Sequence, residues 1–174
     1  MKILTLCGSL RARSVNRALL RVFARLVPAG FVVQPFEHMG RLPHFNPDND
    51  GEMVAAEVAE LRRAVAGADA LVISTPEYTH GLPGSFKNGL DWLVSEPAFA
   101  GKPVVILHAS RGSTWVLDSL TEVLRTMSAR IIAPACVSLP LGSNQLDETA
   151  ILARADLRRL LLDSVTELER HLKS

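Results

Sequence analysis

Residues 8–16 bring together short polar and cationic side chains of the kinds that bind phosphate. The donors are the hydroxyl, amide and guanidinium groups of Ser9, Ser14, Asn16, Arg11 and Arg13. Such groups hold phosphate oxygens, and a helix that starts here adds free backbone N–H groups. The stretch has neither Gly-x-Gly-x-x-Gly nor the Gly-Lys-Ser/Thr ending of a P-loop, so it predicts a site for a terminal monophosphate. The alternative is an ordinary helix cap with scattered serines.

Alternating apolar runs and helical patterns surround this stretch. We predict strands at residues 2–7, 31–36, 70–74, 103–107 and 131–137. The helices are predicted after Ser14 as N-cap, over residues 52–66 and 85–94, through Leu117 to Met127, and from about Glu148 onward. This alternation predicts an α/β fold, a flavodoxin-like doubly wound five-stranded parallel sheet of order 2-1-3-4-5 with helices on both faces.

That strand order determines where a ligand would bind. The loops after the first and third strands flank the switch point of the sheet, where open α/β sheets bind ligands. The first of these loops is residues 8–16, and the second is residues 75–84, which are rich in Pro and Gly. A third polar loop, residues 108–113, follows the fourth strand.

Length and composition exclude several classes of function. The 174 residues are enough for one domain with a full core, so we expect a single domain over 1–174. The formal charge of +1 gives no field that would attract nucleic acid. No apolar run approaches the ~20 residues of a membrane span, and the N-terminus does not resemble a signal peptide, so we expect a cytoplasmic protein.

The cysteines and histidines carry no assigned chemistry. Cys7 and Cys136 each lie in an apolar run, and the predicted strand order separates them by about 14 Å, too far for a disulfide. We expect both thiols to be buried, so redox chemistry would need a bound cofactor. We expect no metal site. His80 and His108 are candidates to touch a substrate, but we assign neither as an obligatory proton donor.

Three motifs occur in order along the chain: Gly8-Ser9-Leu10-Arg11-x-x-Ser14-x-Asn16-Arg17, Leu42-Pro43-x-Phe45-Asn46-Pro47-Asp48 and Thr75-Pro76-Glu77-Tyr78-x-x-Gly81-x-Pro83-Gly84-x-x-Lys87-Asn88-x-x-Asp91-Trp92-Leu93. Together they resemble those of the NADPH-dependent FMN reductase family, which includes quinone, chromate and azo-dye reductases. The resemblance is specific from the first strand to about Trp92 and weaker beyond it.

The resemblance implies binding roles residue by residue. Ser9, Arg11, Ser14 and Asn16, with the amide of Val15, match positions that hold the FMN phosphate. Pro76, Glu77, Tyr78 and Thr79 match the loop that lies along the isoalloxazine ring, largely through backbone groups. Ser110, Arg111 and Gly112 fall near the pyrimidine edge of the ring. Family members often carry Asn after the Glu-Tyr pair, where this chain has Thr79-His80.

The resemblance also implies an activity. An FMN-dependent oxidoreductase would pass hydride from NADPH, or NADH, to bound FMN and then to a quinone, chromate, azo compound or similar small acceptor by a ping-pong mechanism. Since the flavin carries the chemistry, no protein residue is assigned as catalytic. The resemblance further implies a homodimer, or a tetramer as a dimer of dimers, through Lys87, Asn88, Asp91 and Trp92. For Trp92, burial in the core is an equal alternative.

Two other functions remain open from the sequence. One is a flavodoxin-type electron carrier, although such carriers tend to be strongly acidic and this chain has a charge of +1 and a single Tyr. The other is a flavin-free phospholigand-binding protein on the same fold. Binding of FMN would distinguish the oxidoreductase and the electron carrier from a flavin-free protein. Bleaching of the bound flavin by NADPH without a partner protein would distinguish the oxidoreductase from the electron carrier.

Overall fold

A parallel sheet forms the centre of the structure. The structure is a computed structural model, and it describes residues 1–51, 53–110, 112–143 and 145–174. Its strands are Lys2–Cys7 (β1), Val32–Phe36 (β2), Ala70–Ser74 (β3), Pro103–Ser110 (β4), Arg130–Ile131 (β5) and Val137–Pro140 (β6). They run in the order β2-β1-β3-β4-β5, and β6 pairs with β4. This arrangement confirms the predicted α/β fold and strand order.

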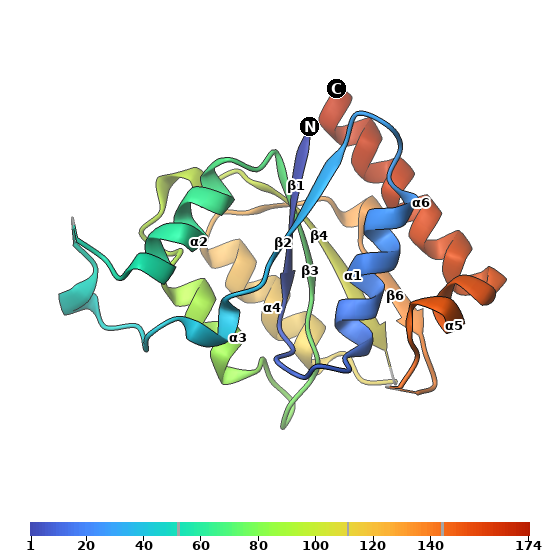
Figure 1. The fold of residues 1–174 in the computed structure, drawn as a ribbon, viewed down its shortest axis with the longest axis horizontal. Coiled ribbons are helices and arrows are strands. Elements are labelled where there is room, and N and C mark those ends of the chain that lie inside the picture. The colour runs from blue at the N-terminus through green and yellow to red at the C-terminus, as the bar shows by residue number, and fades with distance from the viewer. Residues whose placement is uncertain (52, 111, 144) are drawn as a thin grey trace.

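Helices cover both faces of the sheet (Figure 1). One layer consists of Val15–Leu26 (α1), Glu148–Ala153 (α5) and Ala155–Lys173 (α6), and the other of Ala56–Ala66 (α2), Gly84–Asp91 (α3) and Trp115–Thr126 (α4). Successive residues of β3 alternate between the two cores: Ala70 and Val72 pack against the first layer, and Leu71 and Ile73 against the second. A strand buried on both faces explains the uninterrupted apolar run of β3.

The sheet has six strands rather than the predicted five, because the predicted fifth strand, residues 131–137, is interrupted. The chain forms β5, then a 3-10 turn over Ala133–Ala135, then β6. Pro134 in that turn lacks an N–H and cannot take part in a strand ladder. As a result β5 pairs with the start of β4, at Pro103 and Val104, and β6 pairs with its end, from Leu107 to Ser110.

Cys136 fills the gap that this interruption leaves. The backbone N–H of Ile106, in the middle of β4, donates to Cys136 Sγ at 3.3 Å. Both cysteines are free thiols, and each is only partly buried, which corrects the expectation that they are buried. Burial raises the pKa of both thiols, which keeps them protonated near neutral pH.

Several helix boundaries also differ from the prediction. α2 begins at Ala56 rather than at Glu52, which lies outside the described residues. Asp50 is held beside the middle of α2, because its carboxylate accepts from Arg62 Nη2 and Ser95 Oγ, each at 2.7 Å. α3 ends at Asp91 instead of Val94, and the last helix is broken at Arg154, whose backbone is extended.

Trp92 and Asn88, which the family resemblance assigned to a dimer surface, hold a loop of their own chain through hydrogen bonds. Trp92 is 1% exposed, and its indole N–H donates to the carbonyl oxygen of Pro43 at 2.8 Å. The Asn88 amide donates to the same carbonyl, and its oxygen accepts from the N–H of Phe45 at 2.7 Å. Trp92 therefore belongs to the core, which is the alternative that the sequence left open, and Asn88 satisfies polar groups of the loop after β2. The intersubunit surface itself stays a prediction. Lys87 and Asp91 form an ion pair on the partly exposed side of α3.

Across the described residues, no helix is long and apolar enough to span a bilayer.

Candidate functional site

The β1–α1 loop presents its donors at the start of α1. Ser14 is the N-cap, with Oγ accepting from the N–H of Arg17 at 3.4 Å. Val15 is the first helical residue, so its N–H is one of the donors that have no partner within the helix. The positive end of the helix dipole adds to this, which makes the loop suited to an anion.

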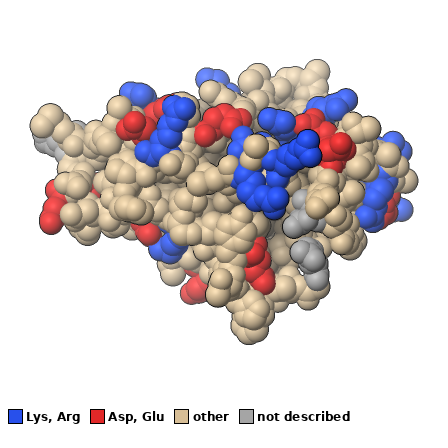
Figure 2. Space-filling model, turned by 60° about the horizontal axis from the view of Figure 1, so that its bottom comes forward, with Lys and Arg blue, Asp and Glu red and all other residues tan. Residues whose placement is uncertain are grey.

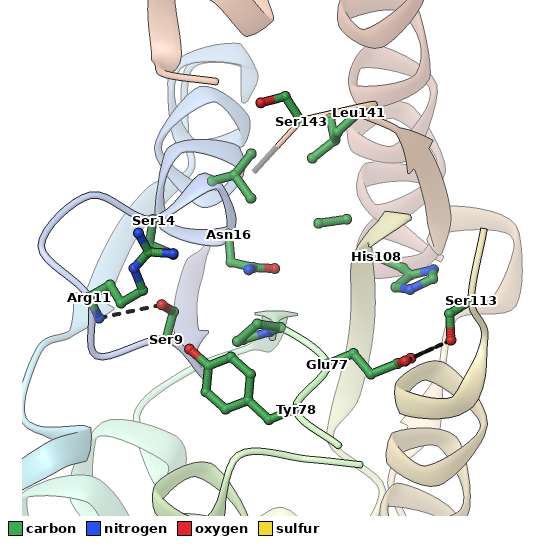
Figure 3. A pocket seen from close by; sticks show the side chains of 13 residues that line it. Ser9, Arg11, Ser14, Asn16, Glu77, Tyr78, His108, Ser113, Leu141 and Ser143 are labelled. Atoms are coloured by element: carbon green, nitrogen blue, oxygen red, sulfur yellow. Dashed lines mark hydrogen bonds between the residues drawn. The ribbon is translucent and has the colours of Figure 1, made fainter. Parts of the chain in front are cut away.

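Ser9 and Asn16, on either side of the N-cap of α1, are both buried and hydrogen-bonded. Ser9 is 3% exposed, and its Oγ accepts from the N–H of Arg11 at 3.4 Å. Asn16 is 4% exposed, and its amide oxygen accepts from Ser74 Oγ at 2.9 Å. This bond ties α1 to the end of β3 and leaves the amide N–H groups of Asn16 as donors. The Arg11 guanidinium lies beside Ser14 on the same side of the cavity (Figure 3).

The β3–α3 loop forms a tight hairpin at its tip. Tyr78 and Gly81 exchange backbone hydrogen bonds at 3.1 and 3.0 Å. The two residues between them both have a positive φ, 51° at Thr79 and 58° at His80. This is the pattern of a type I′ turn, which favours Asn and Gly. The structure thus gives a physical reason why Asn suits the position of Thr79, where a β-branched residue is strained.

The carboxylate of Glu77 accepts hydrogen bonds from other residues of the protein. It accepts from Ser113 Oγ at 2.8 and 2.7 Å and from the N–H of Val116 at 3.1 Å. The N-cap residue of α4, Thr114, makes no capping bond of its own, so Glu77 caps this helix from another loop. The hydrogen bond from Ser113, followed by that from Val116, lowers the pKa of Glu77. Glu77 therefore stays ionised, and its side chain points toward α4 (Figure 3).

The two loops and the end of β4 enclose a cavity of about 330 Å³ (Figure 3). Of the residues predicted to bind a ligand, eight line it: Ser9, Arg11, Ser14, Val15, Asn16, Pro76, Glu77 and Tyr78. Three other described residues, Thr79, Ser110 and Gly112, do not line it. Arg111 falls outside the described residues. The geometry thus joins the first loop and three residues of the second, Pro76, Glu77 and Tyr78, around one space.

Five further residues line the cavity: His108, Ala109, Ser113, Leu141 and Ser143. The sequence analysis placed the first three in or beside a polar loop, but β4 continues through Ser110, so His108 and Ala109 lie on a strand. Leu141 and Ser143 follow β6 and were missed because that strand was misplaced. Gly142, between them, has a φ of 67°. A glycine at this position is the one feature of the sequence that indicates a turn here.

His108 is the buried titratable group of this cavity. It is 6% exposed, and its Nδ1 lies 3.1 Å from Ser138 Oγ on β6. Burial lowers the pKa of His108, although the charges of Glu77 and Asp118 oppose this. The ring is therefore neutral near pH 7, and one of its nitrogens is an acceptor.

Comparison with known proteins places the chain among flavin reductases. The model of the family described as NADPH-dependent FMN reductase matches residues 1–144. The chain belongs to the NADPH-dependent FMN reductase family. This confirms the resemblance found in the three motifs, and with it FMN and a nicotinamide coenzyme as the ligands that characterise the family.

Similar proteins support the assignment. The chain is 36% identical over 115 residues to a quinone reductase of Escherichia coli K12, which covers 64% of this chain and 61% of that protein. It is 39% identical over 118 residues to a 2-hydroxy-1,4-benzoquinone reductase of Burkholderia sp, covering 65% and 62%. The matches thus span less than two thirds of the length of these relatives. Among solved structures, the flavoenzyme NAD(P)H:(acceptor) oxidoreductase FerB from Paracoccus denitrificans superimposes with a TM-score of 0.73 at 25% identity, covering 98% of both chains.

The donors in the cavity fit FMN. At one end, hydroxyls, an amide, a guanidinium and a helix N-terminus suit a phosphate. At the other end, Pro76, Tyr78 and Ala109 offer apolar surface beside the backbone of the β3–α3 loop, which suits a flat ring with polar edges. Within the described residues, no cluster of three His, Cys, Asp or Glu side chains is arranged to hold a metal ion.

Proposed function

We propose that this protein is an FMN-dependent NAD(P)H oxidoreductase that reduces a quinone, chromate, azo compound or similar small acceptor. The observation that carries the proposal is the single cavity in which anion donors of the β1–α1 loop face the backbone of the β3–α3 loop. Bound FMN would supply the redox chemistry, taking a hydride from NADPH or NADH and passing the electrons to the acceptor in a separate, ping-pong half-reaction.

The chain itself would bind and orient the cofactor. Ser9, Ser14 and Asn16, the N–H of Val15 and the Arg11 guanidinium would hold the phosphate. The fixed distance between this end and the β3–α3 loop, set by the bond from Ser74 to Asn16, would determine where the ring lies.

The backbone of Pro76, Glu77, Tyr78 and Thr79 would run along the ring. Its pyrimidine edge would face the segment of Ser110, Arg111 and Gly112. Donors there would stabilise negative charge that develops on the ring during reduction.

The wider setting is also proposed. Residues 1–174 would form a single FMN-binding domain that works in the cytoplasm. We propose a homodimer or a dimer of dimers, as the family resemblance implies. Of the four residues first assigned to its surface, Lys87 and Asp91 remain partly exposed on α3, whereas Trp92 and Asn88 are engaged within the chain.

An anaerobic titration tests this function. Purified protein, saturated with FMN, is mixed with NADPH or NADH, and the flavin absorbance band is followed. We expect the band to bleach with one equivalent of coenzyme and to return when benzoquinone is added.

Two outcomes would contradict the proposal. Protein that stays colourless after incubation with FMN would indicate a flavin-free phospholigand-binding protein. Yellow protein that NADPH and NADH bleach only in the presence of a partner reductase would indicate a flavodoxin-type electron carrier.

A further inference from the structure

A second hollow adjoins the phosphate end of the cavity. It measures about 600 Å³, and we call it the arginine groove. Residues 11–15 with Arg17, Ala18 and Arg21 line one side, and residues 145–148, which lead into the first residue of α5, line the other. Arg11, Ser14 and Val15 border both the cavity and the groove. The two spaces therefore meet at the residues that suit the FMN phosphate.

Positive charge dominates the arginine groove. Its lining includes four arginines, Arg11, Arg13, Arg17 and Arg21. In Figure 2, Lys and Arg side chains gather around a hollow on the face where the strands end, with a few acidic side chains beside them. A groove with this excess of guanidinium groups attracts anions, and phosphate esters above all.

The acidic residues of the groove are already engaged. Glu148 accepts from Arg21 Nη1 at 3.2 Å and lies 4.0 Å from Arg25 Nη1. Asp147 is the N-cap of α5, with Oδ1 accepting from the N–H of Ala150 at 2.8 Å. Arg17 is held by Glu37 at 2.7 Å. Arg11 and Arg13, both exposed, are thus the cations best placed to receive a ligand.

We propose that the arginine groove binds a second phosphate of a nucleotide, next to the phosphate of the flavin. Its volume lies within the range of about 300–1,000 Å³ that is usual for small-ligand sites, so it has room for a ribose and a base. The ligand has two possible sources: the adenylyl half of FAD, or the phosphorylated adenosine of NADPH. The proposal rests on the proposed function, because it needs a flavin phosphate at Arg11 and Ser14.

Arg13 provides the test, because it lines the groove but not the cavity. Arg13→Ala is compared with the wild type and with Arg63→Ala, which removes an exposed arginine from α2 on the opposite face of the sheet. Dissociation constants are measured by calorimetry for FMN and FAD with the apoprotein, and for NADP⁺ and NAD⁺ with the FMN-loaded protein.

We expect Arg13→Ala to raise one dissociation constant about tenfold, the usual effect of losing one charge-assisted phosphate contact. A change for FAD with FMN unaltered identifies the flavin dinucleotide as the source. A change for NADP⁺ with NAD⁺ and FMN unaltered identifies the coenzyme.

The proposal is overturned if Arg13→Ala changes neither FAD nor NADP⁺ binding more than Arg63→Ala does. It is equally overturned if FMN binding weakens as much as FAD binding, since a general field would then explain the effect. Failure of the wild type to bind FMN at all would instead refute the proposed function.

Discussion

The two loops that flank the switch point are built in opposite ways. In the β1–α1 loop, the polar groups that suit a ligand are side chains, and Ser9 and Asn16 are almost fully buried. In the β3–α3 loop, the tip is exposed, Thr79 and His80 take positive φ values, and the side chain of Glu77 is used to cap another helix. One loop offers side chains to a ligand, and the other offers its backbone.

This difference decides what a sequence can reveal. Side-chain donors at a helix start are visible as Ser, Arg and Asn in a row, so the β1–α1 loop was readable as a phosphate site. The shape of a backbone depends on contacts from elsewhere, such as those of Ser113 and Val116 with Glu77, and these have no local signature. Four substitutions test this contrast between side-chain and backbone donors.

Replacing Gly8 should disturb both loops at once. A Cβ on this residue would lie 2.0 Å from Thr75 Oγ1 and 2.5 Å from Thr75 Cβ, too close for either loop to stay in place. We expect Gly8→Ala to lower the free energy of unfolding by about 1–3 kcal/mol, as overpacking of a dense interior does. Urea unfolding measures the change. Gly84→Ala is the matched control, because a Cβ there meets no atom within 4 Å; equal stability of the two variants would contradict the expectation.

Arg11→Ala should affect the phosphate end alone. The loss of one charge-assisted contact to phosphate predicts a dissociation constant for FMN about tenfold higher, and a smaller dependence of that constant on salt. Riboflavin, which has no phosphate, should bind both proteins equally. A fluorescence titration in a series of salt concentrations provides the measurement. An unchanged affinity for FMN would show that the Arg11 side chain faces solvent and does not contact the phosphate.

Glu77→Gln should affect the ring end and the pH dependence of stability. The pKa of Glu77 is lowered in the fold from its usual value of 4.5, so its carboxylate stabilises the protein above that pH, and this contribution is lost as the pH falls below 4.5. We expect the variant to be about 1 kcal/mol less stable at pH 7, the usual cost of a lost helix cap. Its stability should also fall less steeply than that of the wild type on acidification. Parallel pH-dependence curves for the two proteins would exclude this role.

Thr79→Asn should give the smallest effect, and of the opposite sign. Asn tolerates a positive φ better than a β-branched residue, so relief of strain predicts a gain of about 0.5–1 kcal/mol. Thermal unfolding measures this gain. Thr126→Asn, on the exposed end of α4, is a control at a helical position, where no gain is expected. A lower melting temperature for Thr79→Asn would show that the side chain of Thr79 contributes more than its strain costs.

The sequence predicted the strand order because it depends on regular features, namely apolar runs such as 70–74 and connections that must be right-handed. It failed where one residue changed the path of the chain. Pro134 splits the fifth strand, and this hid Leu141 and Ser143, which line the cavity. It also gave no indication that the side chains of Asn88 and Trp92 would bond to the carbonyl of Pro43, or that Asn88 would accept from the N–H of Phe45.

The two tryptophans lie in such different environments that their intrinsic fluorescence can be told apart. Trp92 is sealed inside the fold, whereas Trp115 is 59% exposed and stacks on His80 at a ring separation of 5.4 Å. Their fluorescence should therefore separate into a blue emission that soluble quenchers cannot reach and a red emission that they remove. Because Trp115 starts α4, two residues from Ser113 in the cavity wall, the red component would report a molecule that arrives at the ring end without any added label.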